Sequence, residues 1–163
     1  DLCDTLYEAI NWGLGEIRWF KRAEGKQADD MTAKAAAQTR QLLDWLTARL
    51  DDKEWFGGAT FGWADLSVAP YLNRSVHYGI GPLEGSPLKA WHTRLCARPS
   101  VAATFKEFEA ATQGMGNAAE RLASGAIRRE YRDHRLEWMM KSGGVNIVLD
   151  GIAKNNIRFT WPT

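Results

Sequence analysis

Apolar residues recur at every third or fourth position along most of this chain, and this spacing most constrains its fold. In the first segment they fall at Leu2, Leu6, Ile10, Leu14, Ile17 and Phe20. Such a spacing puts side chains on one face of an α-helix, whereas a half-buried strand needs alternation of every second residue. No segment of useful length alternates in that way. The sequence therefore predicts an all-α helical bundle, whose first helix runs from Leu2 to about Arg22.

The same spacing predicts further helices, separated by polar or glycine-rich breaks. After a polar break at residues 24–30, a second long helix carrying Met31 to Leu50 is expected to run antiparallel to the first. A third helix begins at Trp63 and is expected to kink near Pro70, because proline removes one backbone hydrogen bond and presses on the preceding turn. Further helices are expected from Pro87, from Pro99 or Ser100 with Val101, Phe105 and Phe108 facing inward, across residues 117–141, and around residues 145–152, before an extended end.

The start of the third predicted helix carries the most informative local chemistry. With Gly62 as the residue that caps the helix, Asp65 falls at the third helical position. A carboxylate at that position can accept the backbone N–H of the capping residue and lies at the positive end of the helix dipole. We therefore interpret Gly62, Asp65 and Pro70 as residues with a structural role.

Composition excludes several classes of function. Lys and Arg (21) nearly balance Asp and Glu (20), so no overall field favours nucleic acid or an anionic membrane surface. Cys3 and Cys96 are far apart and neither belongs to a Cys/His cluster, which argues against a metal site and fits a reducing, cytoplasmic setting. No apolar run approaches the roughly 20 residues that cross a bilayer. The chain begins at Asp1, already inside an amphipathic pattern, and is interpreted as a fragment.

Two segments together resemble the C-terminal domain of the cytosolic glutathione S-transferases. Residues 55–72 read WFGGATFGWADLSVAPYL and are similar to the loop and capped helix of that family. Residues 86–105 read SPLKAWHTRLCARPSVAATF and are similar to the short helix, the Arg-Pro break and the next helix. One departure is Gly62, which stands where the family usually has Ser or Thr. Glycine is an accepted cap but supplies no side-chain acceptor, so the cap keeps only the half made by Asp65.

The resemblance implies a glutathione transferase-like helical bundle over residues 1–111 and a helical extension, residues 112–163, packed on the same domain. It also implies that an N-terminal thioredoxin-like domain of the same protein binds and activates glutathione. Glutathione is then the co-substrate of the full-length protein, with none bound by this fragment alone and no catalytic residue in it. A homodimer is the expected assembly.

What remains for this domain, by the same resemblance, is one wall of the site for a hydrophobic electrophile. Tyr7, Asn11, Trp12 and Gly15 are spaced to lie on one side of the first helix and are the candidate wall residues. Glycines at Gly13 and Gly15 cost helix stability, so either close backbone packing or ligand access is expected there. Aromatic residues at helical spacing also commonly fill a core, and that reading stays open for Trp12.

Two functions follow from these observations. The first is the electrophile-binding domain of a glutathione S-transferase-like enzyme, which adds glutathione to hydrophobic electrophiles or cleaves them with it. The second is a non-catalytic protein–protein interaction module, because domains with the same resemblance occur in translation factors and aminoacyl-tRNA synthetases. The sequence that precedes Asp1 would distinguish the two.

Overall fold

The computed structural model of the protein describes residues 13–130 and 134–158. It confirms the all-α fold in these residues, with a two-residue pairing of strands as the described exception. In chain order the described elements are α2 (Gly15–Arg18), α3 (Gly25–Leu50), α4 (Trp63–His77), α5 (Pro87–Cys96), α6 (Pro99–Gln113), the 3₁₀ turn η2 (Gly114–Asn117), α7 (Ala118–Ala123), β1 (Arg129–Glu130), α8 (His134–Lys141), α9 (Val145–Ala153) and β2 (Ile157–Arg158).

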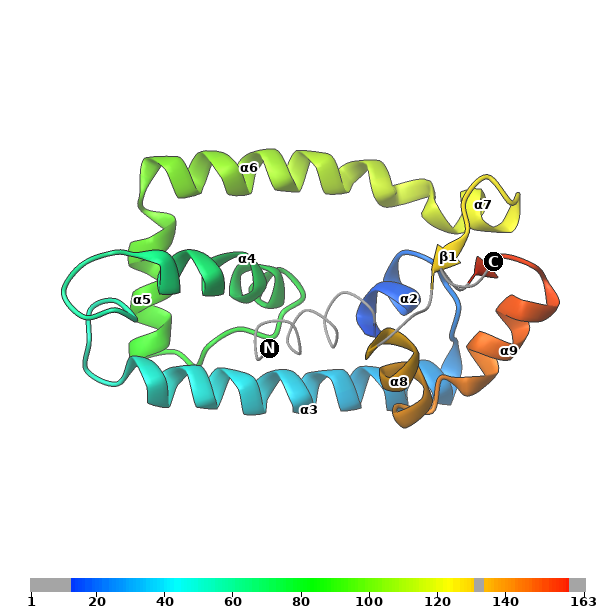
Figure 1. Cartoon of the computed structure of the whole chain (residues 1–163), viewed down its shortest axis with the longest axis horizontal. Helices are drawn as coiled ribbons and strands as arrows, with labels where there is room; N and C mark the ends of the chain where they lie inside the picture. The colour runs from blue at the N-terminus through cyan, green and yellow to red at the C-terminus, as the bar shows by residue number, and fades with distance from the viewer. Residues whose placement is uncertain (1–12, 131–133, 159–163) are drawn as a thin grey trace.

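The two longest sides of the molecule are formed by α3 and α6 (Figure 1). Helix α4 lies between them, and α5 joins the two sides at one end. At the other end, α7, α8 and α9 gather around α2, which lies beside the C-terminal end of α4. Helices from the later part of the chain thus lie beside α2.

Helix α3 begins six residues earlier than the sequence predicted, because Gly25 to Asp30 are helical and not a break. Lys26 and Asp30 form an ion pair of 2.7 Å between Nζ and Oδ2, and both side chains are exposed. An i, i+4 pair of this kind supports a helical turn that faces solvent. The residues before Met31 are polar because this part of the helix is exposed, and Met31 is the first buried residue of α3.

The first helix ends earlier than predicted, since α2 stops at Arg18 and not near Arg22. The backbone of Lys21 has a φ of 50°, a left-handed conformation that a helix cannot contain. The chain turns there, and the N–H of Arg22 donates to the carbonyl oxygen of Glu16 at 3.0 Å. The predicted start of this helix lies outside the described residues.

Residues 117–141 do not form one helical stretch, which corrects another prediction. Helix α7 ends before Gly125, whose φ of 75° is readily adopted by glycine alone. The chain then extends, and the N–H of Arg129 donates to the carbonyl oxygen of Asn156 at 2.9 Å. Strand β1 pairs with β2 in parallel, so the extended end predicted for the chain begins as a paired strand.

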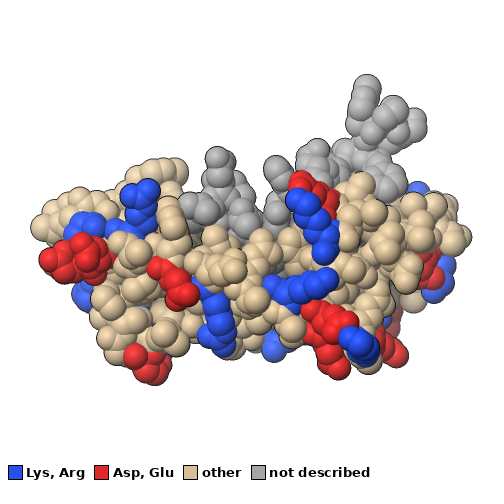
Figure 2. Space-filling view, turned by 90° about the horizontal axis from the view of Figure 1, so that it is seen from below, with Lys and Arg blue, Asp and Glu red and all other residues tan. Residues whose placement is uncertain are grey.

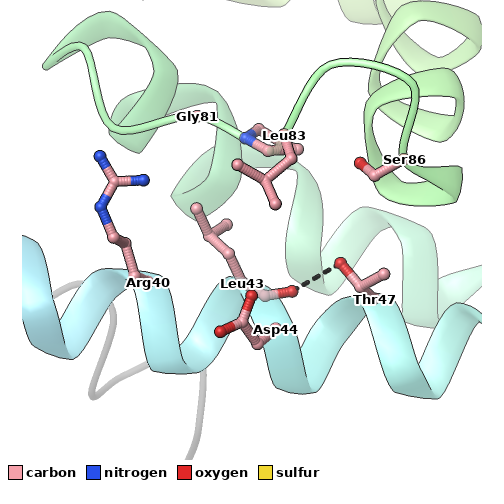
Figure 3. A pocket seen from close by; sticks show the side chains of 8 residues that line it. Arg40, Leu43, Asp44, Thr47, Gly81, Leu83 and Ser86 are labelled. Atoms are coloured by element: carbon pink, nitrogen blue, oxygen red, sulfur yellow. Dashed lines mark hydrogen bonds between the residues drawn. The ribbon is translucent and has the colours of Figure 1, made fainter.

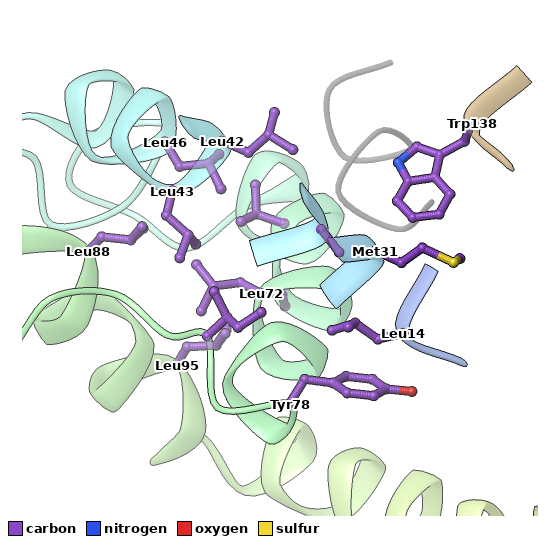
Figure 4. Close-up of a cluster of buried hydrophobic side chains, with 14 of the residues drawn as sticks. Leu14, Met31, Leu42, Leu43, Leu46, Leu72, Tyr78, Leu88, Leu95 and Trp138 are labelled. Carbon is purple, nitrogen blue, oxygen red and sulfur yellow. The ribbon is translucent and has the colours of Figure 1, made fainter. Parts of the chain in front are cut away.

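The core lies where α3, α4 and α5 meet (Figure 4). Its fully buried side chains include Leu88, Trp91 and Leu95 of α5, together with Leu50 and Leu72. Burying one such leucine contributes about 1.5–3 kcal/mol, so this junction is a main source of stability.

Helix α6 packs on this core mainly through its first turn. Val101 is buried and Phe105 is half-buried, but Phe108 is 49% exposed. The prediction that Phe108 faces inward is therefore wrong. Among the described elements, α6 contacts mainly its chain neighbours α5 and η2.

The start of α4 is fixed by the carboxylate of Asp65, which is completely buried. Its Oδ2 accepts the backbone N–H of Gly62 at 2.9 Å, and its Oδ1 accepts the backbone N–H of Phe56 at 3.0 Å. Oδ1 also accepts the indole N–H of Trp91 at 2.8 Å. One side chain thus connects the helix cap, the preceding loop and α5. Pro70 lies within α4 on its exposed side.

Candidate functional site

The predicted substrate wall is described only at Gly15, since Tyr7, Asn11 and Trp12 lie outside the described residues. Gly15 is buried at the start of α2. A Cβ added there would lie 3.8 Å from Cδ1 of Trp19, which is ordinary contact. Space alone therefore does not require glycine at this position. Because Gly15 has no side chain, it does not cover the edge of the Trp19 ring at Cδ1.

Gly13, the other glycine of this helix, is required by close packing. A Cβ added to Gly13 would lie 2.3 Å from Cη2 of Trp138. The indole of Trp138, on α8, fills this space and donates from Nε1 to Oε1 of Gln38 at 2.8 Å. Of the two explanations open from the sequence, close backbone packing holds for Gly13.

Next to Gly15 lies a group of side chains that we call the cation–aromatic cluster: Arg18, Trp19, Arg74, Tyr78 and Phe108. The indole N–H of Trp19 donates to the hydroxyl oxygen of Tyr78 at 2.8 Å, and Nη2 of Arg74 donates to the same oxygen at 3.4 Å. The guanidinium carbons of Arg18 and Arg74 lie 4.8 and 5.0 Å from the centre of the Tyr78 ring. Arg74 also lies 5.2 Å from the centre of the Phe108 ring.

The cluster combines a fixed centre with an accessible edge. Tyr78 is 7% exposed and lies at the border of the core beside Leu14 (Figure 4). Trp19 and Arg74 are half-buried, whereas Arg18 and Phe108 are exposed. Contacts between cations and aromatic faces of this kind contribute about 0.5–2 kcal/mol each, depending on burial. The arrangement offers apolar surface and positive charge together, joined from α2, α4 and α6.

Most of this cluster was missed by sequence reasoning. Arg18 and Trp19 follow Gly15 by three and four positions, so they continue the predicted wall by one helical turn. That signal was present in the sequence. Arg74 and Tyr78 are also an i, i+4 pair, but Trp19 and Tyr78 are separated by 59 residues, and no local pattern brings them together.

Glu16, which follows Gly15 in the chain, is the centre of a buried ionic network. Its side chain is completely buried. Oε1 accepts a hydrogen bond from Nε of Arg129 at 2.8 Å and a second from Nη2 of the same guanidinium. Oε2 lies 3.5 Å from Nε of Arg22. The guanidinium of Arg129 also lies 4.0 Å from the centre of the Phe20 ring.

Arg22 connects this network to the end of the chain. Its Nη2 donates to the carbonyl oxygen of Ile147 at 2.8 Å, and its Nη1 donates to Oδ1 of Asn156 at 3.2 Å. A Cβ added to Gly151 would lie 2.7 Å from Nη2 of Arg22, so the guanidinium passes close against the backbone of α9. Contacts with residues 129–156 therefore stabilise the segment that carries Arg18 and Trp19.

The cavities that are bordered by described residues include two of moderate size. One of about 220 Å³ lies between α3 and the segment before α5, lined by Arg40, Leu43, Asp44, Thr47, Gly81, Pro82, Leu83 and Ser86 (Figure 3). The hydroxyl of Thr47 donates to the carbonyl oxygen of Leu43 at 2.8 Å, and Oγ of Ser86 accepts the N–H of Lys89 at 3.1 Å. This volume is below the usual range of about 300–1,000 Å³ for a small-molecule site.

The second cavity, of about 350 Å³, lies between the first turns of α3 and residues 142–146. Its charged lining includes Lys26 and Asp30, which pair with each other. Their mutual neutralisation leaves Lys34 as the remaining charged lining residue. We therefore place the candidate site at the cation–aromatic cluster and not in either cavity.

Cys96, His92 and Asn73 lie close together but do not form a nucleophilic triad. Sγ of Cys96 is 3.5 Å from Nε2 of His92, and Oδ1 of Asn73 is 3.2 Å from the same nitrogen. A triad needs the two ring nitrogens to face different partners. Burial raises the pKa of the Cys96 thiol, which disfavours the reactive thiolate. Burial, followed by the charge of Lys89, lowers the pKa of His92.

Metal and membrane chemistry find no support in the described part of the chain. Within residues 13–130 and 134–158 there is no group of three or more His, Cys, Asp or Glu side chains placed to hold a metal ion. The helices described there are also too short or too polar to cross a bilayer. On the face covered by α3, basic and acidic side chains are interspersed (Figure 2). That face presents no single-sign surface for a polyanion.

Fold and site together define an all-helical domain in which α2, α4 and α6 bring the cation–aromatic cluster together. Its helical bundle is the architecture expected of a transferase C-terminal domain. The chain belongs to this family: residues 15–99 match "Glutathione S-transferase, C-terminal domain". The match ends at the start of α6, so the contacts of residues 129–156 with the first helix lie beyond it.

Curated relatives agree with this assignment. The chain is 32% identical over 112 residues to glutathione S-transferase U28 of Arabidopsis thaliana, which covers 65% of the chain and 47% of the relative. It is 26% identical over 88 residues to the disulfide-bond oxidoreductase YfcG of Escherichia coli, and 28% identical over 88 residues to glutathione S-transferase GstB of the same species. These two matches cover 54% of the chain and 41% of each relative. The chain thus spans about half the length of these relatives. No solved structure matches it significantly.

Proposed function

We propose that this chain is the electrophile-binding domain of a glutathione S-transferase-like enzyme, which adds glutathione to hydrophobic electrophiles or uses it to cleave them. The observation that carries the proposal is the position of the cation–aromatic cluster, one helical turn beyond Gly15 on the helix that carries the predicted wall. Within a transferase family, an accessible aromatic surface at this place fits the binding of a flat, apolar substrate.

The chemistry of the cluster supports this role. The Trp19 indole is held by its hydrogen bond to Tyr78, so its ring does not need to be ordered when a ligand arrives. The exposed ring of Phe108 adds apolar surface from α6. The buried network of Glu16, Arg22 and Arg129 keeps the intervening backbone in place. These contacts favour a preformed wall.

Glutathione itself is proposed to bind mainly to an N-terminal thioredoxin-like domain of the same protein. In the described cavities the Lys26 ammonium is paired with Asp30 and the hydroxyl of Thr47 is bonded to backbone, so these two groups are already engaged. The raised pKa of the Cys96 thiol also disfavours a thiolate role for that residue. This division agrees with a chain that spans about half of its relatives. A homodimer is proposed as the assembly, and light scattering of the full-length protein tests it.

We further propose that the bundle of residues 1–111 and the extension of residues 112–163 form one packed domain. Support comes from hydrogen bonds that cross between the two parts, from Arg129 to Glu16 and from Trp138 to Gln38. A reducing, cytoplasmic setting stays a prediction, with which the free thiol of Cys96 is consistent. The relatives named above are transferases and an oxidoreductase, so the interaction module is not the favoured reading.

The test uses the full-length protein with glutathione and a neutral aryl halide such as 1-chloro-2,4-dinitrobenzene. We expect Trp19→Ala to raise the KM for the aryl halide about tenfold while the KM for glutathione changes little, because the lost surface touches only the electrophile. Trp12→Ala is expected to act in the same direction. Trp63→Ala removes an indole that is 82% exposed at the start of α4 and is the matched control.

Trp19→Phe keeps an aromatic ring and loses the hydrogen bond to Tyr78, so it separates the ring surface from the hydrogen bond. A smaller rise in the KM for the aryl halide is expected for this variant. Unchanged kinetics in Trp12→Ala, Trp19→Ala and Trp19→Phe with several electrophiles would remove the wall from this helix. An absence of any glutathione-dependent turnover would instead contradict the enzyme itself.

A further inference from the structure

The cation–aromatic cluster offers an exposed guanidinium and a hydroxyl proton, neither of which a neutral substrate needs. Two guanidinium groups, Arg18 and Arg74, lie within 5.0 Å of the same Tyr78 ring centre. Among the described residues, no carboxylate lies within ion-pair distance of the exposed Arg18 guanidinium. An anion placed beside the exposed Arg18 guanidinium would be attracted by it.

Tyr78 supplies the second observation. Its hydroxyl oxygen already accepts hydrogen bonds from Trp19 and from Arg74, which leaves its proton to be donated. Among the described residues no acceptor receives that proton. Tyr78 is only 7% exposed, and a buried hydroxyl normally finds an acceptor. An anionic oxygen beside the cluster would supply one.

The apolar part of the cluster defines the rest of the ligand. Phe108 is 49% exposed and lies against Arg74, and Trp19 is half-buried next to Gly15. A ligand with an aromatic body and one acidic group would meet these rings and the guanidinium groups together. A carboxylate suits this geometry because guanidinium and phenol donors both form short, charge-assisted hydrogen bonds to it.

We propose that the electrophile accepted by this domain carries a carboxylate, which Arg18 and the Tyr78 hydroxyl recognise beside Arg74. This proposal rests on the proposed function and names its substrate class. Arg18 is a specificity residue in this scheme, because it touches the acidic group and not the reacting carbon. Neutral electrophiles bind through the aromatic surface alone and do not depend on Arg18.

The experiment compares two substrates that differ only in charge, 4-chloro-3-nitrobenzoate and 4-chloro-3-nitrobenzamide, with glutathione and the full-length protein. In Arg18→Gln we expect the KM for the benzoate to rise about tenfold, the effect of losing one charge-assisted contact, and the KM for the benzamide to change less than about twofold. Arg18→Lys keeps the charge without the planar guanidinium and should recover part of the loss. Tyr78→Phe should raise the KM for the benzoate more than the KM for the benzamide, since it loses both the phenol donor and the hydrogen bond that holds Trp19.

Arg49→Gln is the matched control, because Arg49 is an exposed guanidinium that lies 5.2 Å from the ring centre of Trp45 on α3. It removes the same charge from another aromatic neighbour and should leave both KM values unchanged. If Arg18→Gln changes the two substrates equally, or changes neither, the proposal is overturned.

Calorimetric titration with 4-chloro-3-nitrobenzoate in the absence of glutathione separates this proposal from the function on which it rests. Binding that weakens about tenfold in Arg18→Gln, in a protein without turnover, would support the anion site and contradict the transferase. If the benzamide is turned over, and the benzoate neither binds more tightly nor has a lower KM, the transferase is supported and the anion site is overturned.

Discussion

Replacing Arg129 with methionine removes the main partner of a completely buried carboxylate. Oε1 of Glu16 loses both hydrogen bonds from the Arg129 guanidinium, and among the described residues Arg22 remains as a nearby cation, with its Nε 3.5 Å from Oε2. Methionine keeps a flexible apolar stem against the ring of Phe20, so little packing is lost. Breaking one side of a buried ion pair costs about 3–5 kcal/mol, and the remaining Arg22 favours the lower end, about 3 kcal/mol.

Urea unfolding of the full-length protein, followed by tryptophan fluorescence and far-ultraviolet circular dichroism, measures this loss. With a denaturant dependence of about 1–3 kcal/mol per molar urea, the midpoint should fall by roughly 1–3 M. Arg128→Met changes the exposed neighbouring arginine and should stay within about 0.5 kcal/mol of the parent protein. The double variant Glu16→Gln with Arg129→Met should be more stable than Arg129→Met alone, since no carboxylate is then left buried.

The reasoning is refuted if Arg129→Met is no more destabilising than Arg128→Met. It is also refuted if the double variant is as unstable as the sum of the two single changes. Either result would mean that the charge of Glu16 is not held by Arg129 in the folded protein.

Three further outcomes are expected. Gly13→Ala should lower the free energy of unfolding by about 1–3 kcal/mol, because its Cβ would overlap the Trp138 ring. Gly15→Ala should raise the free energy of unfolding by about 0.5–1 kcal/mol, and urea unfolding compares the two variants. Gly62→Thr should add about 0.5 kcal/mol by supplying a side-chain cap where the backbone is extended and an added Cβ meets no atom within 4 Å; a thermal shift checks it. The free energy of unfolding should fall as the pH is lowered below about 6.5, and His92→Gln should remove part of that fall, as urea titrations at several pH values would measure.

The sign of the His92 effect follows from its lowered pKa, caused first by burial and then by Lys89. The unfolded chain takes up the proton at a higher pH than the folded chain, so acid favours unfolding between the two pKa values. Below the folded-state pKa the effect no longer grows. His77→Gln makes the same substitution at an exposed position of α4 and is the matched control. Identical pH profiles for His92→Gln and the parent would contradict this account.

The helix starts were predictable because their causes are local. Pro87 and Pro99 occupy the first helical positions of α5 and α6, and Oγ of Ser86 caps α5 at 3.1 Å from the N of Lys89. Trp63 follows a cap whose carboxylate partner, Asp65, lies three residues from Gly62. Signals within one helical turn can be read without knowledge of the fold.

The end of the first helix, and the way in which the C-terminal segment packs on it, were not predictable in the same way. The turn at Lys21 has a non-glycine residue at positive φ, and no sequence rule marks that position as a break. It is stabilised by contacts of Arg22 with residues 125 and 134 positions away. The candidate site has the same limitation, since Arg18 and Trp19 continue a visible stripe whereas Tyr78 joins them only in three dimensions.

The separation of Glu16 from Arg129 also has a consequence for synthesis of the chain on the ribosome. The two residues are 113 positions apart, so Glu16 emerges long before its partner exists. At about 5–20 residues per second, the interval is on the order of ten seconds. During this time the carboxylate of Glu16 has only Arg22 nearby as a described cation, and burying it would be costly. The nascent chain is therefore expected to keep its first helix undocked until the C-terminal segment arrives, so that domain closure is a late event in translation.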